Sequence, residues 1–187
     1  AFKKDERQGN RMTLIDIVKL ALSQMGEDTG VSETDEYGTL LTAYINEAYL
    51  EICREKKHKF STETLAFLEG RADISSLSKD AVSILEIKSD FGAKVYFEIV
   101  ADKIFLIGSE DSDYTVEYLY LPERLSEDTD EPDIKESECY LLADFATYRG
   151  LSLGSPSRQK RAEFFLMRYL SGYSSLGTRR NKIVNKF

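Results

Sequence analysis

The sequence predicts an α+β fold, in which a four-helix scaffold carries an antiparallel β-sandwich or small barrel inserted between its second and third helices. Apolar residues recur at helical spacing towards both ends of the chain, whereas from Phe60 to Leu121 the period changes to two. The alternating runs are short and separated by turn residues, as in antiparallel hairpins. Pro122 ends the last run because it has no N–H for a strand ladder. The β region therefore interrupts a helical scaffold.

This pattern divides the chain into four parts. Residues 1–12 are polar and show no period, and we expect them to form a flexible N-terminal arm. Residues 13–59 and 134–171 form the helical domain, and residues 60–133 form the inserted β domain, with an acidic loop at its end. Residues 172–187 form a basic C-terminal tail with too few apolar groups to fold alone.

Capping residues and apolar spacing predict the first two helices. Thr13 is a good N-cap with Asp16 three residues on, and Gly26 stops the first helix. The second helix begins near residues 34–37 and closes in a cationic run. This run complements the negative end of the helix dipole, or it contacts a phosphate or a partner. The run consists of Arg54, Lys56, Lys57, His58 and Lys59.

The last two helices follow the acidic loop. The third spans residues 134–150 and stops at Gly150. Ser155 caps the fourth, with Pro156 at its first position, where proline is favoured. Basic residues of the fourth helix lie largely outside, and its inward stripe consists of Ala162, Phe165, Leu166 and Tyr169.

Five short runs of apolar, β-branched and aromatic residues are the predicted strands of the β domain. They are Thr64–Leu68, Ser83–Lys88, Val95–Val100, Ile104–Ile107 and Tyr114–Leu121. Residues 73–75 form a further short extended or turn segment. Hairpins between such strands give an antiparallel sandwich or a small barrel.

The acidic loop lies between the last strand and the third helix. Against the single cation of Arg124 it carries six acids, namely Glu123, Glu127, Asp128, Asp130, Glu131 and Asp133. So many like charges cannot be buried, and we expect them in solvent or at an interface. A calcium site is less favoured, because the loop lacks the central glycine and the terminal glutamate of the helix–loop–helix pattern.

Recognisable catalytic and cofactor motifs are missing from the sequence. We find no glycine-rich phosphate loop, nucleophile elbow, zinc spacing or dinucleotide fingerprint, and so expect no enzyme and no cofactor or metal. Cys53 and Cys139 fall on apolar stripes and are predicted to be buried thiols, with a disulfide or a metal pair as the alternative. His58 is predicted to be solvated. Without a signal peptide or a membrane-spanning run, we expect an intracellular, soluble chain.

Charge is distributed unevenly along the sequence. The net charge is −8, but the tail from Gly172 to Phe187 holds four basic residues and no acids. The remainder holds 21 basic and 33 acidic residues and so carries −12. An acidic body repels a nucleic-acid backbone, which argues against a sequence reader held by phosphate contacts. The tail could bind nucleic acid or an acidic protein surface.

The order of several short segments along the chain is informative. These segments are Met12-Thr13-Leu14-Ile15-Asp16-Ile17, Ala21-Leu22, Gly26, Ile45-Asn46-Glu47-Ala48, Ile52-Cys53-Arg54, Thr115-Val116-Glu117-Tyr118, Pro122, Leu125 and Asp128-Thr129-Asp130-Glu131-Pro132-Asp133. Together they resemble the head-to-tail connector (adaptor) proteins of tailed bacteriophages. The similarity covers roughly residues 12–171 and lies in structural rather than catalytic motifs.

The resemblance implies a structural virion protein that is assembled in the host cytoplasm. In that family about twelve copies form a ring beneath the portal protein. The ring extends the channel for double-stranded DNA, without binding it specifically, and offers a platform for tail or nozzle proteins. A ring needs two complementary faces on each protomer, and an acidic body with a cationic tail is one way to supply them.

The tail is the predicted contact with the portal or with a neighbouring protomer. Its apolar anchors are Ile183, Val184 and Phe187, and its steering charges are Arg179, Arg180, Lys182 and Lys186.

A second hypothesis from another class is a small nucleic-acid-binding or regulatory module. The first two helices would form its DNA-reading pair, and the basic tail would form an arm. The charge of −12 on the body weighs against it.

Overall fold

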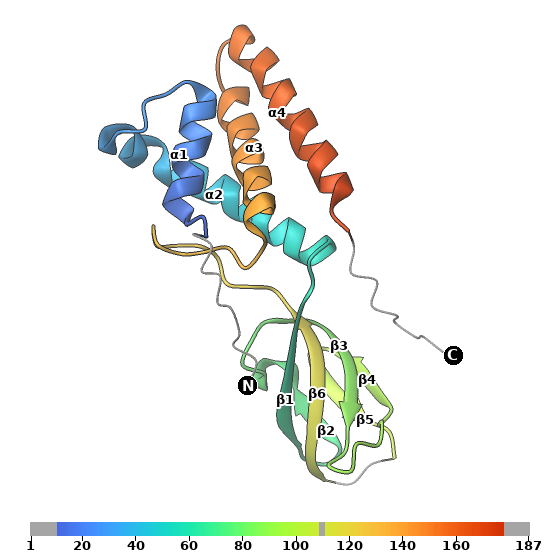
Figure 1. The fold of residues 1–187 in the computed structure, drawn as a ribbon. Helices are drawn as coiled ribbons and strands as arrows, with labels where there is room; N and C mark the ends of the chain where they lie inside the picture. The colour runs from blue at the N-terminus through green and yellow to red at the C-terminus, as the bar shows by residue number, and fades with distance from the viewer. Residues whose placement is uncertain (1–10, 109–110, 178–187) are drawn as a thin grey trace, which may run out of the picture. The chain divides into compact units, whose positions relative to one another are not determined.

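The protein is described from a computed structural model, which defines residues 11–108 and 111–177, with the side chains of residues 31–36 left aside. The chain divides into two compact units (Figure 1). The helical unit contains residues up to 52 and residues 123–177, and the β unit contains residues 53–122. The N-terminal arm up to residue 10 and the tail from residue 178 lie outside the described residues.

Four helices occur at the four predicted places: α1 (Leu14–Met25), α2 (Val31–Glu55), α3 (Glu136–Ser152) and α4 (Pro156–Ser175). In the helical unit α3 packs against both α1 and α4 (Figure 1). Helix α2 adds Leu41, Ile45 and Tyr49 to the buried core. Because α4 runs four residues past the predicted end of the helical domain, Gly172–Ser175 belong to this helix and not to the tail.

The predicted caps of α1 are confirmed. Thr13 and Asp16 form a capping box, in which the Asp16 carboxylate accepts hydrogen bonds from the Thr13 N–H and hydroxyl. At the other end, Gly26 adopts the left-handed conformation with φ of 79°, and its N–H donates to the Leu22 and Ser23 carbonyls. Local chemistry therefore marks both ends of this helix.

Three predicted helix boundaries are wrong. Helix α2 begins at Val31 rather than near residues 34–37. Gly150 does not stop α3, which continues to Ser152. A Cβ atom at Gly150 would lie 3.0 Å from the Met25 Sδ and Cε atoms, so this glycine permits a close helix contact. Helix α2 ends at Glu55, so Arg54 is the one basic residue in its last turn. The rest of the predicted cationic run follows the helix, and half-buried His58 precedes the first strand.

The β unit consists of two three-stranded antiparallel sheets. In the first, β6 (Ser112–Tyr120) lies between β1 (Lys59–Phe67) and β3 (Ala81–Lys88). In the second, β5 (Lys103–Leu106) lies between β2 (Arg71–Asp73) and β4 (Phe97–Val100). Two isolated bridges pair Leu68 with Arg71 and Lys88 with Lys94. The described residues form no closed barrel, so the barrel alternative is wrong.

One strand was not predicted. Strand β2 is three residues long, and it occupies Arg71–Asp73, so it overlaps at Asp73 with the segment at residues 73–75 that was predicted to be extended or a turn. That segment is a 3₁₀ turn at Ile74–Ser76. Three residues are too few to show a period of two, and β2 forms through its antiparallel register with β5.

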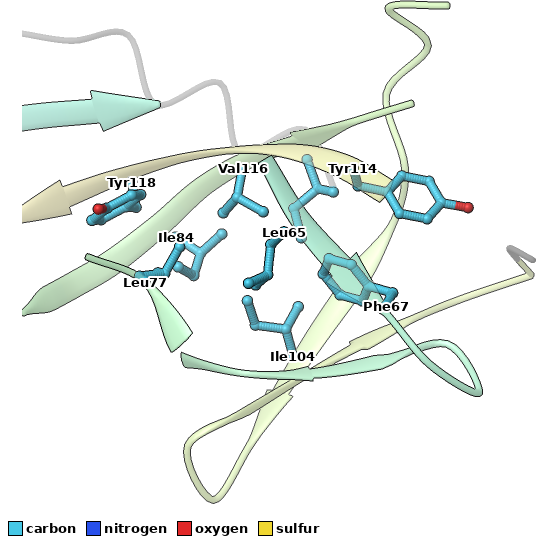
Figure 2. Packing of buried hydrophobic residues seen from close by; sticks show 9 residues of the cluster. Leu65, Phe67, Leu77, Ile84, Ile104, Tyr114, Val116 and Tyr118 are labelled. Atoms are coloured by element: carbon cyan, nitrogen blue, oxygen red, sulfur yellow. The ribbon is translucent and has the colours of Figure 1, made fainter. Parts of the chain in front are cut away.

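The inner faces of the two sheets share one apolar core, shown in Figure 2. Alternate residues of β1 and β6 point into it, as the period of two requires. Phe67 and Tyr114 meet edge to face, with ring centroids 5.4 Å apart. Ile104 from β5 closes the core from the second sheet. The core residues are Leu65, Phe67, Leu77, Ile84, Ile87, Ile104, Tyr114, Val116 and Tyr118.

Ile104 and Ile107 allow a matched test of this core. Ile104 is fully buried, whereas Ile107 is 55% exposed. We expect Ile104→Ala to lower the free energy of unfolding by about 3 kcal/mol, because it leaves a cavity between the sheets. Ile107→Ala should change that free energy by about 0.5 kcal/mol or less. Urea denaturation measures both values, and equal effects would contradict this account of the core.

Candidate interaction surfaces

The acidic segment, residues 123–133, caps the N-terminus of α1. The Leu14 N–H donates to the Asp130 carbonyl at 2.8 Å, and the Ile15 N–H donates to the Asp128 carbonyl at 3.1 Å. The first four N–H groups of a helix have no partner within the helix, and the segment supplies two acceptors. We predicted this loop as part of the β domain, but these bonds explain why it belongs to the helical unit.

Asn46 fixes the start of the acidic segment. Its Nδ2 donates to the Leu125 carbonyl, and the Leu125 N–H donates to Asn46 Oδ1, both at 2.8 Å. The same Nδ2 atom also donates to the Thr42 carbonyl at 3.0 Å. Asn46 and Leu125 are both buried. The side-chain amide of Asn46 satisfies the Leu125 N–H and carbonyl, as the backbone of a neighbouring strand would.

A turn shapes the middle of the acidic segment. The Asp130 carboxylate accepts hydrogen bonds from the Ser126 N–H at 2.7 Å and the Glu127 N–H at 2.9 Å. These backbone donors hold the pKa of the Asp130 carboxyl below its ordinary value. The charge of Asp130 is thus used in hydrogen bonds within the acidic segment.

The other acidic side chains of the segment face solvent, as predicted. Glu131 lies 3.7 Å from Arg11, and both side chains are well exposed. Within the part of the chain that the structure describes, no group of three or more His, Cys, Asp or Glu side chains is placed to hold a metal ion. The exposed acids are Glu123, Glu127, Asp128, Glu131 and Asp133.

Helix α4 has an apolar outer face in addition to its buried inner face. Ala162, Phe165 and Tyr169 are buried, as the predicted inward stripe requires. On the opposite side lies a set that we call the α4 stripe, spaced three residues apart. It comprises Phe164, Met167 and Leu170, which are 58%, 66% and 45% exposed.

The exposed position of the α4 stripe was not predicted from the sequence. Phe164 and Phe165 are adjacent, as are Leu166 and Met167, so apolar residues occur on two sides of the helix. The helical period identified only the more regularly apolar side of the helix, which faces the core. The sequence carried one sign of a second apolar face, because the apolar residues of α4 extend around more of the helix than one packed face requires.

Basic residues of α4 hold the helix in place. Arg158 pairs with Glu27 at 2.7 Å, and Arg161 donates to the Gln24 carbonyl at 2.9 Å. Both contacts lie at the C-terminal end of α1. Lys160 is exposed on the same face as the α4 stripe.

A buried carboxylate also ties α4 to α3. Arg168 Nη2 lies 3.2 Å from the Asp144 carboxylate, which also accepts a hydrogen bond from Gln24 Nε2 at 3.2 Å. Burial raises the pKa of the Asp144 carboxyl, while the Arg168 charge opposes that shift. These contacts fix the orientation of the α4 stripe relative to α1 and α3.

Other titratable groups are accounted for by packing. Cys53 and Cys139 are buried, as predicted, and no disulfide joins them. Burial raises the pKa of the Cys139 thiol to about 11, so it stays protonated at neutral pH. The pKa of Tyr169 is also raised by burial, beside Glu51. No described helix combines the length and the apolar character that crossing a membrane requires.

An open hollow in the β unit is lined by charged residues that pair with one another. Arg71 pairs with Glu69, and Lys103 lies 3.7 Å from Asp73. Asp111 accepts a hydrogen bond from the Gly70 N–H at 3.1 Å. Its remaining lining residues are Leu68 and Ala72. These contacts stabilise the turn at Gly70.

Neither a protein-family model nor a curated protein sequence matches this chain. In the described part of the chain, the helical unit offers two exposed surfaces that are candidates for a function. The predicted acidic residues form the first surface together with the capping backbone. The predicted tail residues, Arg179, Arg180, Lys182, Ile183, Val184, Lys186 and Phe187, lie outside the described residues.

Replacing Asn46 tests the anchoring of the acidic segment. We expect Asn46→Leu to lower the free energy of unfolding by about 2–4 kcal/mol, because the Leu125 N–H and carbonyl stay buried without partners. The control is Glu47→Gln at the next position, which loses an exposed ion pair with Arg149 and should cost about 0.5 kcal/mol. A change of under about 0.5 kcal/mol for Asn46→Leu would show that the segment is held by other contacts.

Titration of Asp130 tests the turn. The pKa of the Asp130 carboxyl is lower in the folded protein than in the unfolded chain. Its ionised form therefore stabilises the folded protein at a pH above the unfolded pKa, and this stabilisation is lost as the pH falls through the folded pKa. We therefore expect the Ser126 and Glu127 amide shifts to titrate with a midpoint below 3.8, the ordinary value. Nuclear magnetic resonance measures this midpoint, and Asp130→Asn should abolish the titration. A midpoint above the ordinary value would contradict the turn.

Proposed function

We propose that this chain is a structural virion protein, a head-to-tail connector (adaptor) of a tailed bacteriophage. It forms a ring beneath the portal, extends the DNA channel and joins the capsid vertex to the tail. The observation that carries this proposal is the pair of exposed surfaces on the helical unit, one acidic and one apolar. The resemblance of residues 12–171 to the connector family supplies the particular assembly and its copy number of about twelve.

The chemistry of the described side chains supports a binding role. Groups with perturbed pKa values are explained by structural contacts: Asp130 orders a turn, Asp144 pairs with Arg168, and Cys139 is packed in the helical core. A shifted pKa indicates a catalytic group when it comes with a cleft and a reacting partner. A protein that acts through its surfaces needs neither.

Two further parts of the chain are assigned by this proposal. The tail from Leu176 to Phe187 reaches the portal or a neighbouring protomer, with its apolar residues as anchors and its cations for steering. The exposed acids of the acidic segment lie at an interface or face the channel. In the channel, their charge would let duplex DNA pass without sticking.

The alternative, a nucleic-acid-binding or regulatory module, is disfavoured by the position of the acidic segment. This segment covers the N-terminus of α1 through two backbone hydrogen bonds. A DNA-reading helix pair would bring that end of α1 towards phosphates, and the exposed carboxylates beside it would repel them.

Electron microscopy of the full-length chain mixed with portal-bearing procapsids tests the proposed function. We expect a ring of added density at the portal vertex. A variant that ends at Gly177 should remain folded and should lose this density, because it lacks the tail contact. The purified chain should show no salt-dependent binding to duplex DNA. An empty vertex together with such DNA binding would favour the alternative function.

A further inference from the structure

We infer that copies of this chain contact one another head to tail, with the α4 stripe of one copy seated on the acidic segment of the next. The inference rests on the proposed function only for its requirement that the protein assembles with itself. It assigns the two halves of that contact to described residues. The partner of the α4 stripe is thus a second copy of the same chain.

The α4 stripe has the composition of a contact centre. Lys160, Phe164 and Met167 are spaced four and three residues apart and so share one helix face. Phe164 stacks edge to face on buried Phe165, with ring centroids 5.3 Å apart, which fixes its exposed ring. Aromatic and methionine side chains are enriched at interface centres. Because the Phe164 ring is held in one orientation, it loses little entropy on binding.

The positive charge beside the α4 stripe favours an acidic partner surface. Three of the four basic residues of α4, Arg158, Arg161 and Arg168, contact groups of the same unit, and the exposed cation of Lys160 is in line with the stripe. Two α4 helices packed in parallel about a two-fold axis would bring their Lys160 cations together, which disfavours that contact. The acidic segment offers five exposed carboxylates against one arginine. It is the complementary surface on the same unit.

The geometry of α1 prevents these charges from meeting within one chain. The acidic segment caps the N-terminal end of α1, whereas Arg158 and Arg161 of α4 hold its C-terminal end. With 12 residues, α1 is about 18 Å long. That length exceeds the screening distance of about 8 Å at physiological salt. Lys160, which lies between Arg158 and Arg161 in the sequence, and the exposed acids are thus at opposite ends of α1, which favours a contact that repeats from copy to copy.

The contact should be weak between two free copies. Three apolar anchors fall short of the roughly 800 Å² per partner that a stable complex buries. Closure of a ring would strengthen it, because each copy is then held on both sides. We therefore expect association that depends on concentration and weakens with salt.

Sedimentation velocity of the full-length chain over a concentration series tests the inference. Met167→Glu should weaken association at least about 30-fold, because it places a charge at the centre of the contact. Charge reversal of the segment by Glu127→Lys with Asp128→Lys should weaken it by about tenfold or more. Both sites are exposed, so the fold should be kept. Matched controls are Lys19→Glu on α1 and Phe91→Glu in the β unit, which should leave association unchanged.

Mixing the two defective proteins distinguishes this contact from others. The Met167→Glu chain keeps an intact acidic segment, and the doubly reversed chain keeps an intact α4 stripe, so together they should form a one-to-one dimer that grows no further. No dimer in the mixture would overturn the inference. Wild type that stays monomeric at the highest concentration, or association lost only when the tail is removed, would also overturn it.

The outcome is separable from that of the proposed function. A vertex ring that persists in both variant proteins would refute this contact and leave the connector assignment in place. A bare vertex with wild-type protein would refute the connector assignment, even if the chain associates with itself in solution.

Discussion

The helical unit depends on a reciprocal pair of hydrogen bonds between the Asn46 side chain and the Leu125 backbone. These residues are 79 positions apart, and the β unit lies between them in the sequence. By holding Leu125, Asn46 sets where residues 126–130 begin, and these residues place the two carbonyls that cap α1. A single buried amide thereby links α2, the acidic segment and α1. Because the site is buried, loss of this amide would strand backbone groups away from water.

Local rules predicted the features that have local causes. Thr13, Asp16 and Gly26 act within a turn of the residues they cap, and Pro156 lies at the first position of α4, as predicted. Gly150 was predicted to end α3 by the same kind of rule, but it does not, because its role is in tertiary packing. It gives room to Met25 of another helix, and no pattern near residue 150 records that neighbour. The existence of elements was therefore easier to predict than their ends.

The candidate surfaces could be predicted only in part, for the same reason. The acids of residues 123–133 were visible as a charge run, and their exposure follows from the cost of burying charge. Their backbone role was hidden, since carbonyl hydrogen bonds leave no trace in side-chain identity. The outward position of Met167 was hidden as well. Periodicity reports which face of α4 is most apolar, but it does not report whether the opposite face is covered.

Capping of α1 by Asp128 and Asp130 has a consequence for biosynthesis. The hydrogen bonds from the first turn of this helix to these two residues cannot form until the ribosome has made about 115 further residues, which takes roughly 6–23 seconds at ordinary elongation rates. Over that interval the nascent N-terminal helices expose their apolar faces, while the β unit has its whole sequence available earlier. We therefore expect the emerging chain to need chaperone protection at its beginning rather than at its middle.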